Sequence, residues 1–538
     1  MHIVSVSEMK AIEEEANANG FGYDQMMHRA GISMAHIVLK RFSGPGPHQV
    51  LGLVGSGNNG GDTLIALSMM QKSGWKSVAC LAKERLHDDP LITAFLDAGG
   101  RIINYGKTDS QEKLIRSIQQ STVILDGILG TGFKLPLREN AAGLLRLVAE
   151  FTKDGYIVAV DCPSGTDCDS GKCAAETLRA DITICMAAMK KGLLKFPAFG
   201  LVGEIIYADI GLPENAFDAV ENKTLAIDNR WVKKKLPERA PDAHKGVFGK
   251  SLVCGGSVNY PGAPLLAAEA AYRVGTGLVC TAIPSAIYDS LVGSLPESIW
   301  LMLPNELGLL DQAAAEVLNP EIEKYDAVLI GPGLGLGKST KDFLSYLFNS
   351  RETGKKRRSI GFLPGELINN QRTNNQKKFV FDADALRIIS EFENWYHKID
   401  EDIVITPHPG EMSAMTGLSI KEIQENRIEV AKKYAEEWKL VIVLKGAGTV
   451  ISAPKREPVI IPVASPALAT AGTGDVLAGL ITGLLAQGLD AYDAAVAGAL
   501  IHGYAGLYAQ RTCRQSASVI ARDIISHIPE VLKNITAH

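Results

Sequence analysis

Short runs of β-branched and other aliphatic residues alternate with longer amphipathic stretches along the whole chain. In the first half, six such runs are bounded by polar or glycine-rich segments, a pattern that predicts β-strands. The six runs are Gln49–Val54, Ser77–Leu81, Thr122–Asp126, Ile157–Asp161, Ile182–Cys185 and Ile205–Ala208. Strands that alternate with helices predict a parallel sheet with helices on both faces, so we expect an α/β fold.

The chain is long enough for two domains, because its 538 residues exceed the size of an ordinary single domain. The first strand–helix pattern ends near Ile210–Pro213, before a polar, helix-breaking stretch. We therefore predict an N-terminal domain over residues 1–212, a linker over 213–227 and a C-terminal domain over 228–538. The polar segment Arg351–Lys378 predicts a surface insertion, with a basic flap over a phosphate-bearing ligand as the alternative.

Composition and charge argue against several classes of partner. The net charge of -5 is modest for this length, so neither nucleic acid nor an anionic membrane is expected. The apolar run around Val476–Leu489 is interrupted by glycines and is too short to span a bilayer. Eight cysteines do not make a disulfide framework in so long a chain. We expect a cytoplasmic protein, and a homo-oligomer because glycine-rich α/β enzymes often assemble.

The loop after the first predicted strand combines a dinucleotide-like glycine pattern with unusual polar residues. The glycines of Gly55–Gly60 satisfy GxGxxG, which places a pyrophosphate at a helix N-terminus. A carboxylate at Asp62 would compete with that pyrophosphate for the positive helix end. Together with Asn58 and Asn59 it predicts an oxygen-rich pocket for sugar hydroxyls, an amide or a monovalent cation. Helix capping by Asp62 is the alternative.

Two further predicted strands end in carboxylates. Asp126 precedes a glycine-rich turn, and Asp161 precedes Cys-Pro-Ser164-Gly. Because the carboxyl ends of parallel strands meet at one edge of a sheet, we expect these residues to converge with Asn59 and Asp62 in one site.

The segments Glu13–Gly31, Asn58–Asp62, Asp126–Pro136 and Asp161–Gly165 resemble the NAD(P)H-hydrate epimerase domain over about residues 1–212. The resemblance implies a Rossmann-like three-layer αβα domain whose substrate is a nicotinamide cofactor hydrated at C6 of its dihydropyridine ring. It also implies a potassium ion held by Asn59, Asp126 and Ser164. The implied substrate contacts are Asn58, Asn59, Gly60, Gly61, Asp62, Gly130, Thr131, Gly132, Phe133, Lys134, Leu135, Pro136 and Asp161. Asp161 is a candidate acid or base for epimerisation, and Lys134 is the alternative.

The most specific signal in the chain is Ala469–Asp475, which reads Ala-Thr-Ala-Gly-Thr-Gly-Asp before an apolar run. Gly472 and Gly474 let backbone N–H groups turn toward a phosphate at a helix N-terminus. Asp475 would then accept a proton from a substrate hydroxyl as phosphoryl transfer begins. A glycine-rich turn with a capping aspartate is the alternative.

Other loops follow predicted strands in the same half. Lys445–Thr449, after the strand Leu440–Leu444, is a candidate for holding nucleotide phosphates or ribose, with an exposed strand-end lysine as the alternative. Gly331–Ser339, after the strand Ala327–Ile330, nearly matches a Walker A loop, but Pro332 replaces its first required glycine. This loop therefore predicts a backbone-lined substrate crevice.

Three polar residues complete the set. His408 lies between two prolines and is a candidate substrate contact. Asp382 and Glu411 are candidates for orienting magnesium, with helix capping as the alternative for both.

This ordered series of motifs, from Lys245–Gly246 to Gly472–Asp475, resembles the NAD(P)H-hydrate dehydratase domain of the ribokinase superfamily over about residues 228–535. The resemblance implies a second αβα domain, in which ADP or ATP with Mg²⁺ phosphorylates the hydrate and phosphate elimination restores the dihydronicotinamide. Asp475 is the implied base. The implied nucleotide contacts are Lys445, Gly446, Ala447, Gly448, Thr449, Gly472, Thr473 and Gly474. The implied hydrate contacts are Ala263, Gly333, Gly335, His408 and Asp475.

Two alternatives stand beside this bifunctional repair enzyme. One is a ribokinase-like kinase of a vitamin precursor with a regulatory N-terminal domain. The other keeps the dehydratase but makes the N-terminal half a non-catalytic binding module, which would not need the polar set around Asp126 and Asp161.

Overall fold

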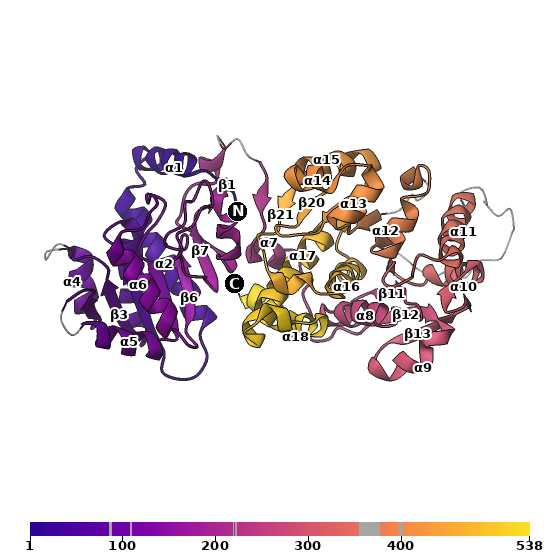
Figure 1. Cartoon of the computed structure of the whole chain (residues 1–538), viewed down its shortest axis with the longest axis horizontal. Coiled ribbons are helices and arrows are strands. Elements are labelled where there is room, and N and C mark those ends of the chain that lie inside the picture. The colour runs from indigo at the N-terminus through magenta and orange to yellow at the C-terminus, as the bar shows by residue number, and fades with distance from the viewer. Residues whose placement is uncertain are drawn as a thin grey trace. The chain divides into compact units, whose positions relative to one another are not determined.

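The computed structural model describes residues 1–85, 89–107, 110–218, 220, 223–354, 377–397 and 402–537. The chain divides into two compact units (Figure 1). Unit 1 contains Met1–Asp228 with Pro462–Ala464, and unit 2 contains Asn229–Ile461 with Ser465–His538. Residues 213–227, which the sequence suggested as a linker, fall within unit 1 by this division.

Unit 1 is built on a parallel sheet with the strand order β4-β3-β2-β5-β6-β7-β9. The strands are β2 (Gln49–Val54), β3 (Lys76–Leu81), β4 (Arg101–Asn104), β5 (Val123–Gly127), β6 (Tyr156–Val160), β7 (Ile182–Met186) and β9 (Glu204–Ala208). A separate parallel pair joins β1 (Ile3–Val4) to β8 (Met189–Lys190). The six predicted strands are confirmed to within one residue at each end, and β4 is additional.

Helices cover both faces of this sheet. They are α1 (Val6–Ala18), α2 (Tyr23–Arg41), α3 (Asn58–Lys72), α4 (Pro90–Asp97), α5 (Ser110–Gln120) and α6 (Glu139–Phe151). Side chains of α1 to α4 share one buried cluster with Val50 and Val54 of β2, whereas α5 and α6 share another with Leu51 and Leu53. Alternate residues of a strand point to opposite faces, so a run that is apolar throughout is a strand buried on both sides.

The strand order of unit 1 reverses between β2 and β5. From β2 the chain continues to β3 and β4 on one side, and it then returns to β5 on the other side of β2. Such a reversal opens a crevice at the carboxyl ends of the two strands, where ligands of open α/β sheets bind. Asn59 lies in the first turn of α3, which follows β2, and Asp126 is the last but one residue of β5.

The sheet of unit 2 has the order β21-β20-β19-β18-β17-β16-β11-β12-β13, parallel from β19 to β13 and antiparallel at β20 and β21. Its strands are β11 (Lys250–Cys254), β12 (Leu278–Pro284), β13 (Ile299–Leu303), β16 (Ala327–Ile330), β17 (Lys378–Phe381), β18 (Asp402–Ile405), β19 (Val441–Leu444), β20 (Val450–Ser452) and β21 (Val459–Ile460). Two further strands of unit 2, β14 (Asn305–Glu306) and β15 (Leu309–Leu310), form a separate antiparallel pair. The two-residue strand β10 (Leu225–Ala226) falls within unit 1. The predicted strand Ala327–Ile330 is confirmed, and the one at Leu440–Leu444 begins one residue later.

The helices of unit 2 are α7 (Asn229–Lys233), α8 (Gly262–Arg273), α9 (Tyr288–Leu291), α10 (Gln312–Ile322), α11 (Lys338–Gly354), α12 (Asp384–Ile389), α13 (Pro409–Thr416), α14 (Ile420–Glu425), α15 (Arg427–Trp438), α16 (Thr473–Ala486), α17 (Ala491–Cys513) and α18 (Ala521–Ala537). Every residue of α16 from Val476 to Ala486 is buried, as expected of a helix that is apolar on all sides. It packs closely on α8, since a Cβ on Gly479 would lie 2.1 Å from the carbonyl oxygen of Ala267. In the part of the chain that the structure describes, no helix is both long and apolar enough to cross a membrane.

The two ends of the predicted insertion Arg351–Lys378 lie in regular secondary structure. Its first four residues belong to α11, and Lys378 opens β17, where its Nζ donates to the carbonyl oxygen of Leu489 at 2.7 Å. Residues 355–376, which make up the rest of the predicted insertion, lie outside the described part of the chain.

Candidate active sites

The loop after β2 runs directly into α3, whose N-cap is Gly57. Asp62 is the fifth residue of this helix and is buried, at 7% exposed. Helix capping, the alternative for Asp62, is therefore wrong. Burial raises the pKa of Asp62 well above its usual value, and the neighbouring carboxyls of Asp161 and Glu13 add to the effect. Asp62 thus keeps its proton to a higher pH than an exposed aspartate does.

Asn59, Asp126 and Ser164 meet around Leu129. Asn59 Nδ2 donates to the carbonyl oxygens of Val160, at 2.7 Å, and Leu129, at 3.3 Å. The Ser164 N–H donates to Asp126 Oδ2 at 2.8 Å, while Ser164 Oγ accepts from the Leu129 N–H at 3.0 Å. Asp126 is fully buried, which raises its pKa against the opposing hydrogen bonds from Ser164. Its Oδ1 has no hydrogen-bond partner among the described residues.

Asp161 follows β6 and forms a buried ion pair with Lys190 of β8. Lys190 Nζ lies 2.5 Å from Asp161 Oδ1 and also donates to the carbonyl oxygens of Ala188, at 3.2 Å, and Met186, at 3.3 Å. Burial lowers the pKa of Lys190, but Asp161 outweighs burial and the net pKa is raised, so this lysine stays charged. Asp161 has a left-handed backbone (φ 65°), a conformation that Asp tolerates better than most residues.

The remaining predicted contacts of unit 1 lie in the loop after β5. Gly130 lies against Asn59, since a Cβ there would come within 2.4 Å of Asn59 Oδ1. Lys134, Leu135 and Pro136 are exposed. The structure therefore leaves Lys134 in an exposed loop and places Lys190 on Asp161. Sequence reasoning missed Lys190, although a lysine directly after the apolar run Ile182–Met189 was a signal of a buried, paired charge.

In unit 2, the turn at Gly472–Asp475 forms the N-terminus of α16. Gly472 is the N-cap with a left-handed backbone (φ 89°). A Cβ on Gly474 would lie 3.5 Å from Lys445 Nζ, so the first turn of α16 faces this lysine. Burial raises the pKa of Asp475 to about 8, with a further contribution from Asp382 and an opposing one from Lys445. The turn thus combines a helix N-terminus, a lysine and a carboxyl whose pKa is raised.

Lys445 follows β19 and contacts two carboxylates. Its Nζ lies 2.7 Å from Asp382 Oδ1 and 3.7 Å from Glu411 Oε2. Asp382 is 1% exposed, and its Oδ1 also accepts a hydrogen bond from Thr406 Oγ1 at 2.6 Å. Burial raises the pKa of Glu411 to about 7, although Lys445 opposes this shift. The ends of β17, β18 and β19 and the start of α13 thus bring these four side chains together at one edge of the sheet.

His408 has a local structural contact that sequence reasoning did not foresee. It is the N-cap of α13, where Nδ1 accepts from the N–H groups of Gly410, at 2.9 Å, and Glu411, at 3.2 Å. Glu411 returns the contact, because its Oε2 accepts from the His408 N–H at 2.8 Å. Helix capping, the alternative for Glu411, is therefore confirmed. Half of the His408 side chain remains exposed, which leaves it open to a ligand.

The glycine-rich loop after β16 lies against the start of α8. A Cβ on Gly333 would lie 3.0 Å from the Cβ of Ala263, so these two predicted substrate contacts adjoin each other. The Gly335 N–H donates to Asp384 Oδ2 at 2.8 Å, which joins this loop to the start of α12. In the loop after β19, Thr449 Oγ1 donates to the carbonyl oxygen of Gly446 at 3.0 Å.

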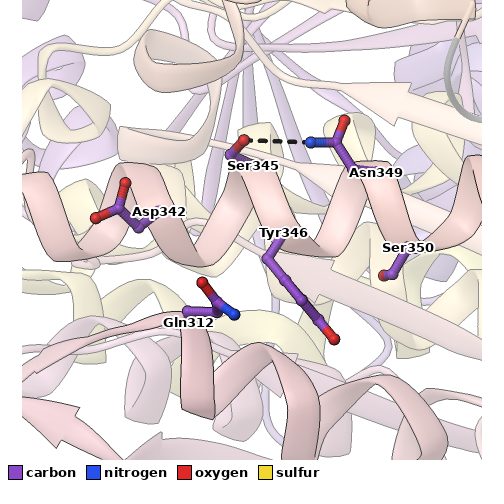
Figure 2. Close-up of a pocket in the computed structure, with 6 residues that line it drawn as sticks. All are labelled: Gln312, Asp342, Ser345, Tyr346, Asn349 and Ser350. Carbon is purple, nitrogen blue, oxygen red and sulfur yellow. Dashed lines mark hydrogen bonds between the residues drawn. The ribbon is translucent and has the colours of Figure 1, made fainter.

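A separate cavity of about 440 Å³ opens between α10 and α11. Figure 2 shows Gln312 on α10 and five side chains on α11 around it. Hydroxyl, amide and carboxylate groups line this cavity, and none of the predicted site residues is among them. The candidate active sites are therefore the loop clusters described above and not this cavity.

Comparison with known proteins agrees with a two-site enzyme. The family model for the NAD(P)H-hydrate dehydratase matches residues 251–530, and that for the YjeF-related protein N-terminus matches residues 23–192. A bifunctional NAD(P)H-hydrate repair enzyme of Moorella thermoacetica is 32% identical over 99% of this chain and 97% of its own. The corresponding enzyme of Escherichia coli K12 is 32% identical over 91% of this chain and 86% of its own.

A solved structure is also similar to part of the chain. It is an ADP/ATP-dependent NAD(P)H-hydrate dehydratase from Bacillus subtilis, co-crystallised with ATP and Mg²⁺, which is 28% identical. The match covers 58% of this chain and 99% of that one, with a TM-score of 0.46.

The folds and sites are those of an enzyme with two α/β catalytic units. The chain belongs to the family of bifunctional NAD(P)H-hydrate repair enzymes. Membership of this family argues against the two alternatives, a vitamin-precursor kinase and a non-catalytic N-terminal module.

Proposed function

We propose that the chain repairs nicotinamide cofactors hydrated at C6, with unit 1 interconverting the two epimers and unit 2 dehydrating the S epimer with consumption of ADP or ATP. One observation carries the proposal: each unit has a strand-end aspartate paired with a lysine, next to a carboxyl whose pKa is raised. Hydration gives two epimers, so a stereospecific dehydratase alone would leave one of them unrepaired. An epimerase site and a dehydratase site on one chain allow both epimers to be repaired.

In unit 1, the hydrate contacts Asn58–Asp62, Gly130–Pro136 and Asp161. Epimerisation requires the C6 hydroxyl to leave as water while the ring nitrogen donates its lone pair to form an iminium. Water then adds to the opposite face and loses a proton. Asp161 gives and takes this proton, and Lys190 holds its carboxylate in place. The three acceptors around Lys190 Nζ favour this fixed role, whereas Lys134 is exposed.

Asn59, Asp126 and Ser164 would hold a potassium ion in unit 1. Amide, carboxylate and hydroxyl oxygens suit a hard cation, and the buried Asp126 Oδ1 without a hydrogen-bond partner in the described residues fits a metal ligand. When bound, the ion supplies a fixed positive charge beside the hydrate.

In unit 2, Asp475 takes the proton of the C6 hydroxyl as the terminal phosphoryl group of the nucleotide moves to that oxygen. Phosphate then leaves C6 and takes up the proton that C5 loses, which restores the ring double bond and releases inorganic phosphate. The raised pKa of Asp475 supports its role as the base, because a stronger base accepts a hydroxyl proton more readily. Ala263, Gly333, Gly335 and His408 contact the hydrate.

The nucleotide lies on Lys445–Thr449 and on the turn Gly472–Gly474. Backbone N–H groups at the start of α16 and the Lys445 ammonium attract its phosphates. Asp382 and Glu411 are carboxylates of the kind that bind Mg²⁺, and Lys445 already offsets part of their charge. When bound, Mg²⁺ neutralises charge that builds up on the phosphates.

We also propose that the protein acts in the cytoplasm and assembles as a homo-oligomer. All eight cysteines are free, which is compatible with a reducing compartment.

The test is recovery of dihydronicotinamide absorbance after the protein is added to mixed NADHX epimers with Mg²⁺ and ADP, and then with ATP. Complete recovery would support both activities. Recovery that stops at the fraction of one epimer would leave the dehydratase and contradict the epimerase, and no recovery with either nucleotide would contradict the assignment of unit 2.

A further inference from the structure

One buried histidine of unit 2 has no role in the chemistry described so far. His502 lies in the middle of α17, is 8% exposed, and has an Nε2 without a hydrogen-bond partner among the described residues. Leaving a polar nitrogen buried in an otherwise apolar helix costs free energy. A leucine would fill this position without that cost, so the imidazole calls for an explanation.

The face of α17 that carries His502 packs against both sides of the anion-binding turn. Gly498, one turn before His502, touches Ile481 of α16, and Gly506, one turn after it, touches Leu468 in the segment that precedes the turn. Residues four apart share one face of a helix. His502 therefore lies directly behind Gly472–Asp475, between the two segments that hold this turn.

The imidazole contacts the turn itself. It forms a hydrogen bond with the backbone of Thr473, the first residue of α16. Thr473 is also held by its own Oγ1, which donates to the carbonyl oxygen of Leu468 at 2.8 Å. Burial lowers the pKa of His502 to about 4, so the ring supports the turn as a neutral group and adds no charge beside Lys445.

We propose that His502 is a positioning residue of the dehydratase: it fixes the Thr473 backbone so that the N–H groups of the turn point at the terminal phosphate of the nucleotide. This inference rests on the proposed nucleotide site of unit 2. An anion hole acts through preorganised N–H groups, and a small misplacement of a donor weakens it strongly. His502 acts on the phosphate only through the turn, and it does not touch the reacting atoms.

The test compares binding of ADP and AMP, each with Mg²⁺, to the full-length chain by calorimetry. His502→Leu removes the hydrogen bond while keeping an apolar side chain of similar size, and we expect ADP to bind roughly tenfold more weakly. AMP has no terminal phosphate on the turn, so its affinity should change less than twofold. His502→Asn carries an amide near the position of Nδ1 and should restore most of the ADP affinity.

Leu500→Ala is the matched control, since Leu500 is a fully buried neighbour on α17. It should lower the unfolding temperature and leave the ADP-to-AMP affinity ratio unchanged. Equal losses for ADP and AMP in His502→Leu, or the same ratio change in Leu500→Ala, would overturn the positioning role. If the wild-type chain binds ADP but does not dehydrate the hydrate, the proposed function fails while the binding test of His502 still stands. A wild-type chain that binds neither nucleotide would overturn both.

Discussion

Asp161 in unit 1 and Asp382 in unit 2 occupy corresponding places, because each directly follows an interior strand of a parallel sheet and each pairs with a lysine. The two lysines differ in what surrounds them. Lys190 is enclosed, with 3% of its side chain exposed and two backbone carbonyls as further acceptors. Lys445 is 18% exposed and lies beside Gly474, where no side chain stands between it and the first turn of α16.

This difference in exposure indicates that the two aspartate–lysine pairs have different roles. A lysine whose donors are all taken can hold a carboxylate in place but has little left to offer a ligand. A lysine with an open side next to a helix N-terminus can attract phosphate. The enclosed pair Asp161–Lys190 therefore suits proton transfer to and from the hydrated nicotinamide ring. The open pair Asp382–Lys445 suits binding of a nucleotide.

The largest effect is expected from Asp475→Asn. Loss of the base should lower the dehydration rate at least about a thousandfold. Interconversion of the epimers, followed by chromatography without nucleotide, should be unchanged, because Asp161 and Lys190 are intact. Asp342→Asn is the control: this exposed carboxylate lines the cavity of Figure 2 and should leave both rates within twofold. A comparable loss in the control would mean that the cavity takes part in the reaction.

Asp161→Asn should lower the epimerisation rate roughly a hundredfold to a thousandfold. Asn also tolerates the left-handed backbone, so the loss would reflect the carboxylate and not backbone strain. Dehydration with ADP should then stop at the fraction of the S epimer. Unchanged epimerisation would remove Asp161 from the mechanism.

Lys190→Met and Lys134→Met distinguish the enclosed lysine from the exposed one. Without Lys190 the buried Asp161 charge is unpaired, so epimerisation should fall at least tenfold and unit 1 should lose about 3–5 kcal/mol of stability. Lys134→Met should have little effect on either quantity. Steady-state kinetics measures the epimerisation rate, and chemical denaturation measures the stability. A large loss of rate in Lys134→Met with little loss in Lys190→Met would instead assign the role in epimerisation to Lys134.

The pH profile of dehydration should report the raised pKa of Asp475. Only the carboxylate accepts a proton, so kcat/KM should rise about tenfold per pH unit and level off near pH 8. A carboxyl with an ordinary pKa would give a flat profile above pH 5. Initial rates from pH 5 to 9, with epimerisation as the internal reference, separate the two cases.

The smallest effect concerns stability. The pKa of Asp475 is raised to about 8 on folding, so the folded chain binds its proton more tightly than the unfolded chain does. Stability from this group is therefore present at low pH and is lost as pH rises through about 8. Asp475→Asn should stabilise unit 2 at pH 9 by roughly 1–3 kcal/mol and much less at pH 5. Thermal unfolding at both pH values measures this, and equal shifts would contradict the raised pKa.

The strands were predictable from the sequence because they are short, mostly aliphatic runs, several of which are followed directly by a glycine or an aspartate. Gln49–Val54 and Ala327–Ile330 were found with their full bounds for this reason. The turn at Gly472–Asp475 was also predictable, since its glycines and its aspartate lie together in the chain.

Residues that act through distant partners were not predictable in the same way. Lys190 is 29 positions from Asp161 and lies on a strand of only two residues, so no local periodicity marks it. The capping role of His408 depends on the rotamer of one ring, which spacing does not determine. His502 was hidden inside an apolar helix, and its hydrogen bond with Thr473, together with the contacts of Gly498 and Gly506, reveals what it faces.

The close packing of α8 on α16 also limits how unit 2 can move during turnover. The backbones touch at Gly479 and Ala267, and α16 is buried along its length, so the two helices can slide past each other only if the core opens. The distance between Ala263 at the start of α8 and Asp475 at the start of α16 is therefore set before any ligand arrives. Amide hydrogens along α16 should exchange with solvent among the slowest in the chain, and any closing of unit 2 around its ligands must come from its loops.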